Sequence, residues 1–160
     1  MSAAADLIDA LRRRGWTLGV AESLTGGAVS AELISVPGAS NALLGAVVAY
    51  ATPVKHSLLG VDPGLLDAQG PVHPDVALQM ADGVREAVRL DGRPADVGIS
   101  TTGIAGPDSP DGQPVGTVHI GVVTPETHVI RSYLFEGDRA QVRRSSVDAA
   151  ITAALELVRE

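Results

Sequence analysis

The sequence predicts an α/β fold, a three-layer α/β/α sandwich with a mixed, mostly parallel sheet. Short apolar runs with the length of buried strands alternate with segments whose apolar residues recur every three to four positions. Two further apolar runs near the C-terminal end are separated by one brief turn, which indicates an antiparallel hairpin. The chain has 160 residues, of which 45% are hydrophobic, so we expect one domain over 1–160 with one core.

The first half of the chain is expected to contain two strands and four helices. Ala4, Leu7, Ile8 and Leu11 follow helical spacing, and Gly15 is expected to end that helix. A threonine or aspartate followed by proline is typical of a helix start. The next elements are a strand over 17–21, a helix over about 25–35 ended by Pro37-Gly38, a strand over 44–50, a helix from Thr52-Pro53 to about Gly60 and a short helix from Asp62-Pro63 to Gly70.

The second half is expected to complete the sheet and to end in a long helix. A helical face over 76–88 is followed by the breaker pair Asp91-Gly92, and VGISTT over 97–102 reads as a third buried strand. A long breaker-rich loop spans 103–116. The runs near 117–123 and 128–135 then form the hairpin that makes the sheet mixed. Asp138 is expected to cap the terminal helix.

Composition excludes several classes of function. The formal charge of −7, the pI of about 5.0 and the 2% aromatic content argue against a direct nucleic-acid partner. The chain has no cysteine, and its four histidines show no metal-ligand spacing, so we expect no metal site and no cysteine nucleophile. No apolar run approaches the length of about 20 residues that spans a membrane. We therefore expect a cytoplasmic protein without a membrane partner.

Two polar segments follow the first two predicted strands. In AESLTGG, a helix opening near Ser23, Thr25, Gly26 and Gly27 would leave backbone N–H groups free to bind an anion or an oxyanion. Spacing alone favours the competing interpretation, in which Ser23 or Thr25 is an ordinary helix cap. In YATPVK, Tyr50 and Lys55 fall at a strand-to-helix corner, where ligands often bind in α/β sheets. A neutral lysine can act as a base, but spacing alone favours a solvated surface lysine.

Two more segments are candidates for ligand binding. Thr102 and Gly103 begin the loop after the third strand, and a loop of this length is uncommon in a compact domain unless it has a function. A plain surface connection is the competing interpretation. Arg139 and Arg143 lie four residues apart on the last helix and share a face. Together they can clamp a phosphate, although composition favours pairing with surface acids.

Taken together, the segments AESLTGG, VVAYATPVK, TTGIAGP, PVGTV and EGDRAQVRR resemble the CinA C-terminal family. This is the competence/damage-inducible protein family that includes bacterial nicotinamide-mononucleotide deamidases. The resemblance runs in order from about residue 5 to 155. It implies the same three-layer fold, and it implies hydrolysis of the carboxamide of nicotinamide mononucleotide to nicotinate mononucleotide and ammonia.

The resemblance also assigns roles to residues. Ser23 resembles the nucleophile, Lys55 its base and Tyr50 a supporting hydroxyl. Thr102 and Gly103 resemble substrate-pocket residues, and the arginines of the GDR segment fall where a phosphate contact is expected. We expect the N–H groups near Thr25 and Gly26 to hold the oxyanion, with no cofactor or metal. The family also leads us to expect a homo-oligomer.

The chain departs from the family pattern at several positions. Family members often have cysteine in place of Leu24, asparagine in place of Thr52 and serine in place of His73, and the loop after Pro107 is slightly shorter here. Thr52 and the loop are the departures that bear on how a substrate is oriented. The alternative function from a different class is a catalytically idle nucleotide-binding or protein-interaction module in a competence or DNA-damage response.

Overall fold

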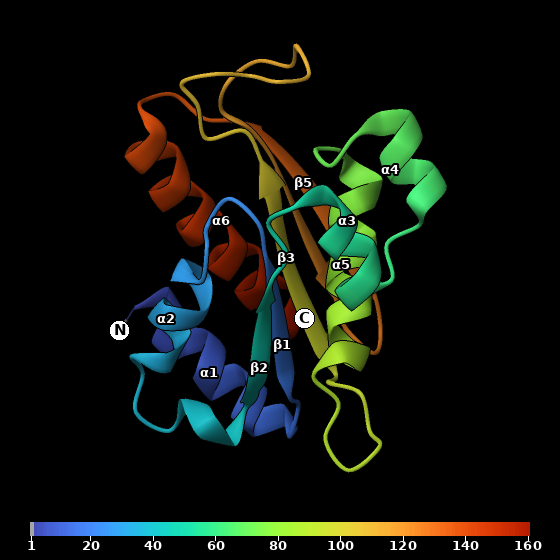
Figure 1. Ribbon diagram of the computed structural model, residues 1–160. Coiled ribbons are helices and arrows are strands. Elements are labelled where there is room, and N and C mark those ends of the chain that lie inside the picture. The colour runs from blue at the N-terminus through green and yellow to red at the C-terminus, as the bar shows by residue number, and fades with distance from the viewer. Residues whose placement is uncertain (1) are drawn as a thin grey trace.

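The computed structural model describes residues 2–160 as a five-stranded sheet between two layers of helices (Figure 1). The strands are β1 (Leu18–Glu22), β2 (Leu43–Val48), β3 (Val97–Gly103), β4 (Thr117–Val123) and β5 (His128–Leu134). The helices are α1 (Ala3–Arg14), α2 (Ala28–Ile34), the 3₁₀ turn η1 (Ala39–Asn41), α3 (Thr52–Leu59), α4 (Pro63–Gln69), α5 (Pro74–Ala87) and α6 (Arg139–Arg159).

The strands lie in the order β2-β1-β3-β4-β5. β1 is parallel to both of its neighbours, β2 and β3, whereas β4 is antiparallel to both β3 and β5. Four strands therefore run in one direction and β4 runs in the other. This topology confirms the predicted mixed, mostly parallel sheet and the predicted hairpin of the last two strands.

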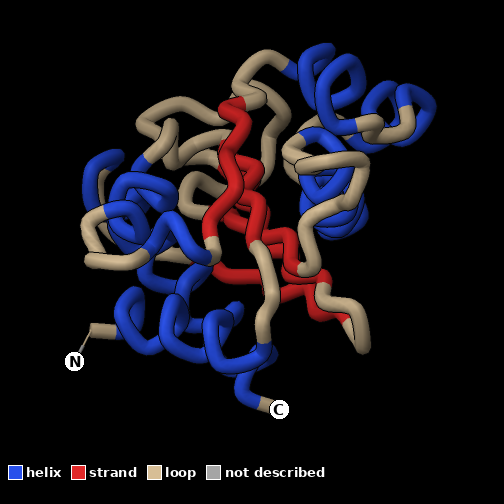
Figure 2. The backbone as a smooth tube through the Cα atoms, turned by 90° about the horizontal axis from the view of Figure 1, so that it is seen from below, coloured by secondary structure: helices blue, strands red, loops and turns tan. Residues whose placement is uncertain are grey.

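The helices divide between the two faces of the sheet. α1, α2 and α6 pack together on one face, and α3, α4 and α5 cover the other (Figures 1 and 2). The larger core lies under α1, α2 and α6, and a smaller one lies under α3 and α5. α5 lies so close to the sheet that a Cβ at Gly98 would be 1.8 Å from the carbonyl oxygen of Ala81. Because the chain has few large aromatic side chains, the core is filled by bringing the helix and the sheet close together.

Local signals explain most of the helix ends. Asp138 accepts a hydrogen bond from the Gln141 N–H, which confirms its predicted role as the cap of α6. Two predictions were wrong. α2 begins at Ala28 rather than near Thr25, because the residues from Ser23 to Gly27 form a tight turn first. The cap of α3 is Ala51, so Thr52 lies in the first turn and its side chain caps nothing.

The three parallel strands β2, β1 and β3 end at the same edge of the sheet, at Val48, Glu22 and Gly103. Each is followed by one of the polar segments that the sequence singled out. In open α/β sheets, ligands bind outside the carboxyl ends of the parallel strands. The topology therefore brings Ser23, Lys55 and the loop after β3 to one place.

Candidate active site

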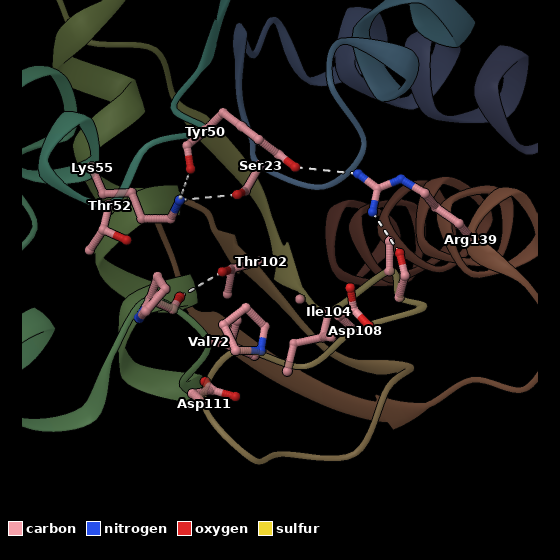
Figure 3. Close-up of a pocket in the computed structure, with 15 residues that line it drawn as sticks. Ser23, Tyr50, Thr52, Lys55, Val72, Thr102, Ile104, Asp108, Asp111 and Arg139 are labelled. Carbon is pink, nitrogen blue, oxygen red and sulfur yellow. Dashed lines mark hydrogen bonds between the residues drawn. The ribbon is translucent and has the colours of Figure 1, made fainter.

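A cavity of about 400 Å³ opens at this edge of the sheet (Figure 3). Its volume is in the range typical of small-molecule sites. Its walls come from the turn after β1, the start of α3, the segment before α5, the loop after β3 and the start of α6. The lining residues are Ser23, Tyr50, Thr52, Lys55, Pro71, Val72, Thr102, Gly103, Ile104, Ala105, Gly106, Asp108, Pro110, Asp111 and Arg139.

Ser23 is the first residue after β1 and is held from the neighbouring strand. Its N–H donates to Thr101 Oγ1 at 3.2 Å, and the same threonine oxygen is 2.9 Å from Thr25 Oγ1. Thr101 lies on β3 and is fully buried, as is Thr25. These bonds fix the backbone of the turn and leave the Ser23 hydroxyl to face the cavity. Thr25 therefore supports the turn and does not line the cavity.

The start of α2 is occupied by a carboxylate of the protein itself. Glu22, with no exposed surface, accepts hydrogen bonds from the N–H groups of Val29 (2.9 Å) and Ser30 (3.0 Å) and from the Ser30 hydroxyl (2.5 Å). This carboxylate satisfies N–H groups that a helix start otherwise leaves unpaired. The anion-binding alternative that the sequence left open is therefore contradicted, because Glu22 already occupies this helix start.

The two glycines of AESLTGG shape the turn. Gly26 and Gly27 adopt φ angles of +59° and +103°, which residues with a side chain rarely tolerate. The Gly26 N–H donates to the Ser23 carbonyl at 3.1 Å, so it is not free to hold an oxyanion. The expectation that the Gly26 N–H holds the oxyanion is therefore wrong. Neither glycine lines the cavity. Both glycines instead allow the tight backbone turn that positions Ser23.

Lys55 is the only lysine in the chain, and it is 1% exposed. Its Nζ donates hydrogen bonds to Ser23 Oγ at 3.0 Å, to the Ala49 carbonyl at 2.7 Å and to the Tyr50 carbonyl at 3.4 Å (Figure 3). The ion pairs among residues 2–160 involve arginine or histidine, so none engages Lys55. Burial lowers its pKa from 10.5 to about 8.

The surroundings of Lys55 suit a neutral amine as well as a charged one. A protonated lysine has three N–H donors, and three acceptors surround it. A neutral amine has two N–H groups and one lone pair. If the carbonyls of Ala49 and Tyr50 take the two N–H groups, the lone pair is directed at the Ser23 hydroxyl. The site therefore has the connectivity of a nucleophile and its base.

The Tyr50 hydroxyl lies away from Lys55. It accepts a hydrogen bond from Arg139 Nη2 at 3.3 Å, and the residue is 64% exposed at the rim of the cavity. The expectation that this hydroxyl supports the base is not matched by the geometry, because Tyr50 contacts Lys55 through its backbone carbonyl.

The two arginines of α6 reach different places. Arg139 lines the cavity and donates from Nη1 to the Gly106 carbonyl at 2.7 Å. Arg143 lies outside it and donates from Nε to the Leu24 carbonyl (2.9 Å) and from Nη2 to the Thr25 carbonyl (3.2 Å). The two guanidinium groups therefore do not form one phosphate clamp. One faces a ligand, and the other fixes the turn that carries Ser23.

The segment after β3 forms the opposite wall. Thr102 Oγ1 donates to the Pro71 carbonyl at 2.6 Å, which ties β3 to the segment before α5. At Gly103 a Cβ would lie 2.7 Å from the Thr117 carbonyl oxygen, so glycine is required there by packing. Both residues line the cavity, as the sequence-based assignment to a pocket requires. The loop beyond adds Asp108 and Asp111 to the rim.

Sequence reasoning missed several residues that the geometry brings in. Glu22 and Thr101 lie within the segments AESLTGG and TTGIAGP but were given no role, and the two rim carboxylates Asp108 and Asp111 were not singled out at all. Asp111 accepts hydrogen bonds from the side chain and the N–H of Gln113, and the side-chain bond most of all lowers its pKa. A signal existed for Thr101 and Glu22, because each directly precedes a candidate site residue, Thr102 or Ser23, at the end of a strand.

Residues 2–160 contain neither a candidate metal-ion cluster nor a membrane-spanning helix. No group of three or more histidine, aspartate or glutamate side chains in this range is arranged to hold a metal ion. None of the helices in the same range combines the length and the apolarity needed to cross a membrane.

Comparison with known proteins places the chain in a family. The sequence model of the CinA C-terminal domain matches residues 1–158. The chain belongs to the CinA C-terminal domain family. It is 48% identical over 149 residues to a CinA-like protein of Frankia casuarinae and 43% identical over 148 residues to a putative competence-damage inducible protein of Desulforamulus reducens. These matches cover 93% and 92% of this chain but 32% and 34% of the relatives, so it spans about a third of their length.

Solved structures of the CinA superfamily share the fold along the whole chain. The protein KP700603 of Klebsiella pneumoniae superposes with a TM-score of 0.90 at 29% identity, covering 98% of this chain and 96% of that one. The competence/damage inducible protein CihA of Agrobacterium tumefaciens gives 0.89 at 27% identity, covering 100% and 98%. The CinA resemblance and the α/β fold inferred from the sequence are thereby confirmed.

Proposed function

We propose that this CinA domain hydrolyses the carboxamide of nicotinamide mononucleotide to nicotinate mononucleotide and ammonia. Ser23 is the nucleophile and Lys55 is its base. The observation that carries the proposal is that the only lysine of the chain is buried, forms no ion pair with an acidic residue among residues 2–160 and lies 3.0 Å from a serine hydroxyl that faces a cavity. A lysine with this environment has little structural purpose, because an apolar side chain would avoid the cost of burying an amine.

The proposed reaction has two stages. Neutral Lys55 takes the proton of the Ser23 hydroxyl, and Oγ attacks the carboxamide carbon. The C–N bond then breaks, and the lysine ammonium gives its proton to the departing nitrogen, which leaves as ammonia. In the second stage Lys55 takes a proton from water, whose oxygen attacks the acyl-serine. The bond between the acyl carbon and Ser23 Oγ then breaks, Lys55 returns the proton to Oγ, and the acid product leaves and ionises to the carboxylate. With the Gly26 N–H engaged, we assign the oxyanion to the N–H of Leu24, the residue after the nucleophile.

The charges around the cavity fit the proposed substrate. Arg139 lies at the rim with donors beyond the two that it uses, and a guanidinium suits a phosphate. Asp108 and Asp111 line another part of the rim, where carboxylates favour a positively charged pyridinium ring or ribose hydroxyls. A zwitterionic mononucleotide offers both charges.

An ammonia-release assay tests the proposal. Purified protein is incubated in separate reactions with nicotinamide, its riboside and its mononucleotide, and ammonia and the carboxylate products are measured. We expect release from the mononucleotide and much less from the two smaller amides. Binding of the mononucleotide by calorimetry without any ammonia would instead support the catalytically idle module. Equal turnover of all three amides would contradict the role of Arg139 and point to a general small-amide hydrolase.

A further inference from the structure

The short segment between α4 and α5 forms one wall of the cavity and is held by side chains from other elements. Pro71 and Val72 of this segment line the cavity (Figure 3). Thr102 Oγ1 at the end of β3 donates to the Pro71 carbonyl at 2.6 Å, and Gln113 Nε2 in the loop after β3 donates to the Val72 carbonyl at 3.0 Å. The next residue, His73, is the N-cap of α5. Three consecutive contacts therefore hold this wall, and a histidine makes the last of them.

His73 caps α5 through a ring nitrogen that carries no proton. Its Nδ1 accepts a hydrogen bond from the Asp75 N–H at 3.1 Å, which pairs one of the N–H groups that a helix start leaves free. Nδ1 can accept only in the neutral ring, with the proton on Nε2, because both ring nitrogens of a protonated histidine are donors. A serine or asparagine cap has no such condition, since its side-chain oxygen accepts at every pH. The cap of α5 therefore depends on the charge of one ring.

The protonated ring has a second partner beside the first. Asp75 Oδ2 lies 3.8 Å from His73 Nδ1, which is within ion-pair distance. When Nδ1 gains a proton, it stops accepting from the Asp75 N–H and becomes a donor to the Asp75 carboxylate. The N–H is then left without its acceptor. The start of α5 thus has two arrangements, and the proton on His73 selects between them.

A second histidine faces the start of α5 but is kept neutral. His119 on β4 lies directly opposite Thr102 on β3, and because Thr102 bonds to the segment before α5, both side chains are on that face of the sheet. His119 is buried, and its Nδ1 is 2.8 Å from the Ser132 hydroxyl of β5. Burial, followed by the nearby charge of His73, lowers the pKa of His119. The first proton taken up on this face therefore goes to His73.

The other charged groups beside the segment keep their charge between about pH 5.5 and 7. Asp111 in the loop accepts from the Gln113 side chain, which most of all lowers the pKa of Asp111 and keeps it ionised. Lys55 of α3 lines the same cavity, and with a pKa of about 8 it stays protonated below about pH 7. The neighbouring elements also carry two exposed groups, Asp67 on α4 and His128 at the far end of β5. In this range the charge of His73 is the one that changes at the wall of the cavity.

We propose that His73 is a positioning residue, which holds the wall formed by Pro71 and Val72 in place for a ligand only while its ring is neutral. Protonation frees the first turn of α5 directly after this wall, so ligand binding should weaken as the pH falls from about 7 to about 5.5. Ser23 and Lys55 keep their contacts, and the effect should therefore appear in KM and not in kcat. Naming nicotinamide mononucleotide as the ligand rests on the proposed function, whereas the link between the cap and the wall does not.

NMR of the ¹⁵N-labelled chain tests the cap and its link to the wall without a ligand. The scalar coupling across the bond from the Asp75 N–H to His73 Nδ1 should be present at about pH 8 and vanish as the ring is protonated. The side-chain amide signal of Gln113, which bonds to the Val72 carbonyl, should shift with the same midpoint. In His73→Ser this signal should stay constant. In His128→Ser, the matched loss of an exposed histidine, it should behave as in the native chain.

His73→Ala separates the cap from the charge, because it has neither. Its Gln113 signal should lie near the low-pH position of the native chain at every pH. A position equal to that of the native chain at about pH 8 would show that the charge of the ring alone moves the signal, and would overturn the link between the cap and the wall. Absence of the coupling to Nδ1 in the native chain at about pH 8 would overturn the cap itself. Thermal unfolding checks that each variant is folded.

Ligand binding gives the second measurement. In a Ser23→Ala background, which binds without turnover, calorimetry with nicotinamide mononucleotide compares the native His73 with His73→Ser and His73→Ala. At about pH 8, His73→Ser should bind like the native residue and His73→Ala roughly 3- to 10-fold more weakly, which is the size expected for a lost cap. At about pH 5.5 the native residue should bind nearly as weakly as His73→Ala. Comparison within one pH cancels the titrations of Lys55 and of the ligand phosphate. Equal dissociation constants for all three at about pH 5.5 would contradict the proposal.

The role of His73 and the proposed reaction fail in different ways. If the native protein neither binds the mononucleotide nor releases ammonia, the proposed function fails, and the Gln113 signal still decides whether His73 holds the wall. If ammonia is released but the ratio of the native KM to that of His73→Ser is the same at both pH values, the reaction stands and the role of His73 is overturned. If that ratio rises roughly 3- to 10-fold on acidification while the ratio of the kcat values stays constant, both proposals stand.

Discussion

Lys55 at the floor of the candidate cavity and Arg139 at its rim are both cations that donate to backbone carbonyls, yet their surroundings differ. Lys55 is 1% exposed and its hydrogen bonds all go to neutral oxygens, whereas Arg139 is exposed and shares the cavity lining with Asp108 and Asp111. Burial without a counter-ion destabilises the charged form of an amine, but an exposed guanidinium keeps its charge. The floor is thus suited to moving a proton and the rim to holding a charged ligand.

The largest expected effect comes from the floor. Ser23→Ala and Lys55→Met should each lower kcat by roughly 1,000-fold or more, because each removes one member of the nucleophile and base pair. Both changes fit the space already present, so thermal unfolding should remain cooperative. The double variant should be little worse than either single one, since the two groups act as a unit. Independent, multiplying losses would show that Ser23 and Lys55 do not act together.

Arg143 is expected to have a smaller effect on catalysis, because it only positions the turn that carries Ser23. Arg143→Met removes the bonds to the Leu24 and Thr25 carbonyls and should lower kcat by roughly 10- to 100-fold with little change in KM. Arg143→Lys should recover part of the loss. Arg144→Met, one residue further along the same helix and exposed, is the matched control and should behave as the native chain.

The contrast with Arg139 sharpens the comparison. Arg139→Met should raise KM for the mononucleotide by roughly 10-fold or more and leave the weak reaction with the riboside unchanged, because only the mononucleotide has a phosphate. Steady-state kinetics with both substrates measures this split. A fall in kcat for both the mononucleotide and the riboside would show that Arg139 acts on the Ser23 and Lys55 pair and not on the ligand.

The pKa of Lys55 predicts how activity and stability depend on pH. The neutral amine is the active base, so kcat/KM should rise with pH and level off above about pH 8. The folded pKa of about 8 lies below the unfolded value of 10.5, so the unfolded chain binds more protons between these two values. The free energy of unfolding should therefore rise with pH in this window, by up to about 3 kcal/mol relative to Lys55→Met.

Because Lys55 is the only lysine, its titration can be followed directly. Reductive methylation with ¹³C-formaldehyde under denaturing conditions, followed by refolding, labels Lys55 and the N-terminal amine, and NMR then reports two titrating signals. One of them should shift with a midpoint near 8 that returns to about 10.5 in denaturant. A folded midpoint near 10.5 would remove the neutral base from the mechanism.

The sequence predicted the fold and the floor better than the rim. Strand and helix periods located the corners that bring Ser23 and Lys55 together, because the carboxyl ends of parallel strands meet at one edge. They could not show that Glu22 fills the start of α2, or that Arg143 turns to the Leu24 carbonyl while Arg139 turns to the cavity. Such choices depend on side-chain directions across elements distant in sequence, which spacing along one helix does not contain.

The smallest effect on kcat is expected from Tyr50, whose backbone carbonyl and side-chain hydroxyl have different partners. Its carbonyl accepts from Lys55 Nζ, whereas its hydroxyl accepts from Arg139 Nη2 at the exposed rim. Tyr50→Phe keeps the carbonyl and removes only the hydroxyl, so we expect kcat to change by less than about threefold, since an exposed hydrogen bond contributes about 1 kcal/mol or less. A loss of 100-fold or more in kcat would instead show that the Tyr50 hydroxyl contacts Ser23 or Lys55 during the reaction. That result would assign Tyr50 to the catalytic group formed by Ser23 and Lys55 and not to the rim that binds the ligand.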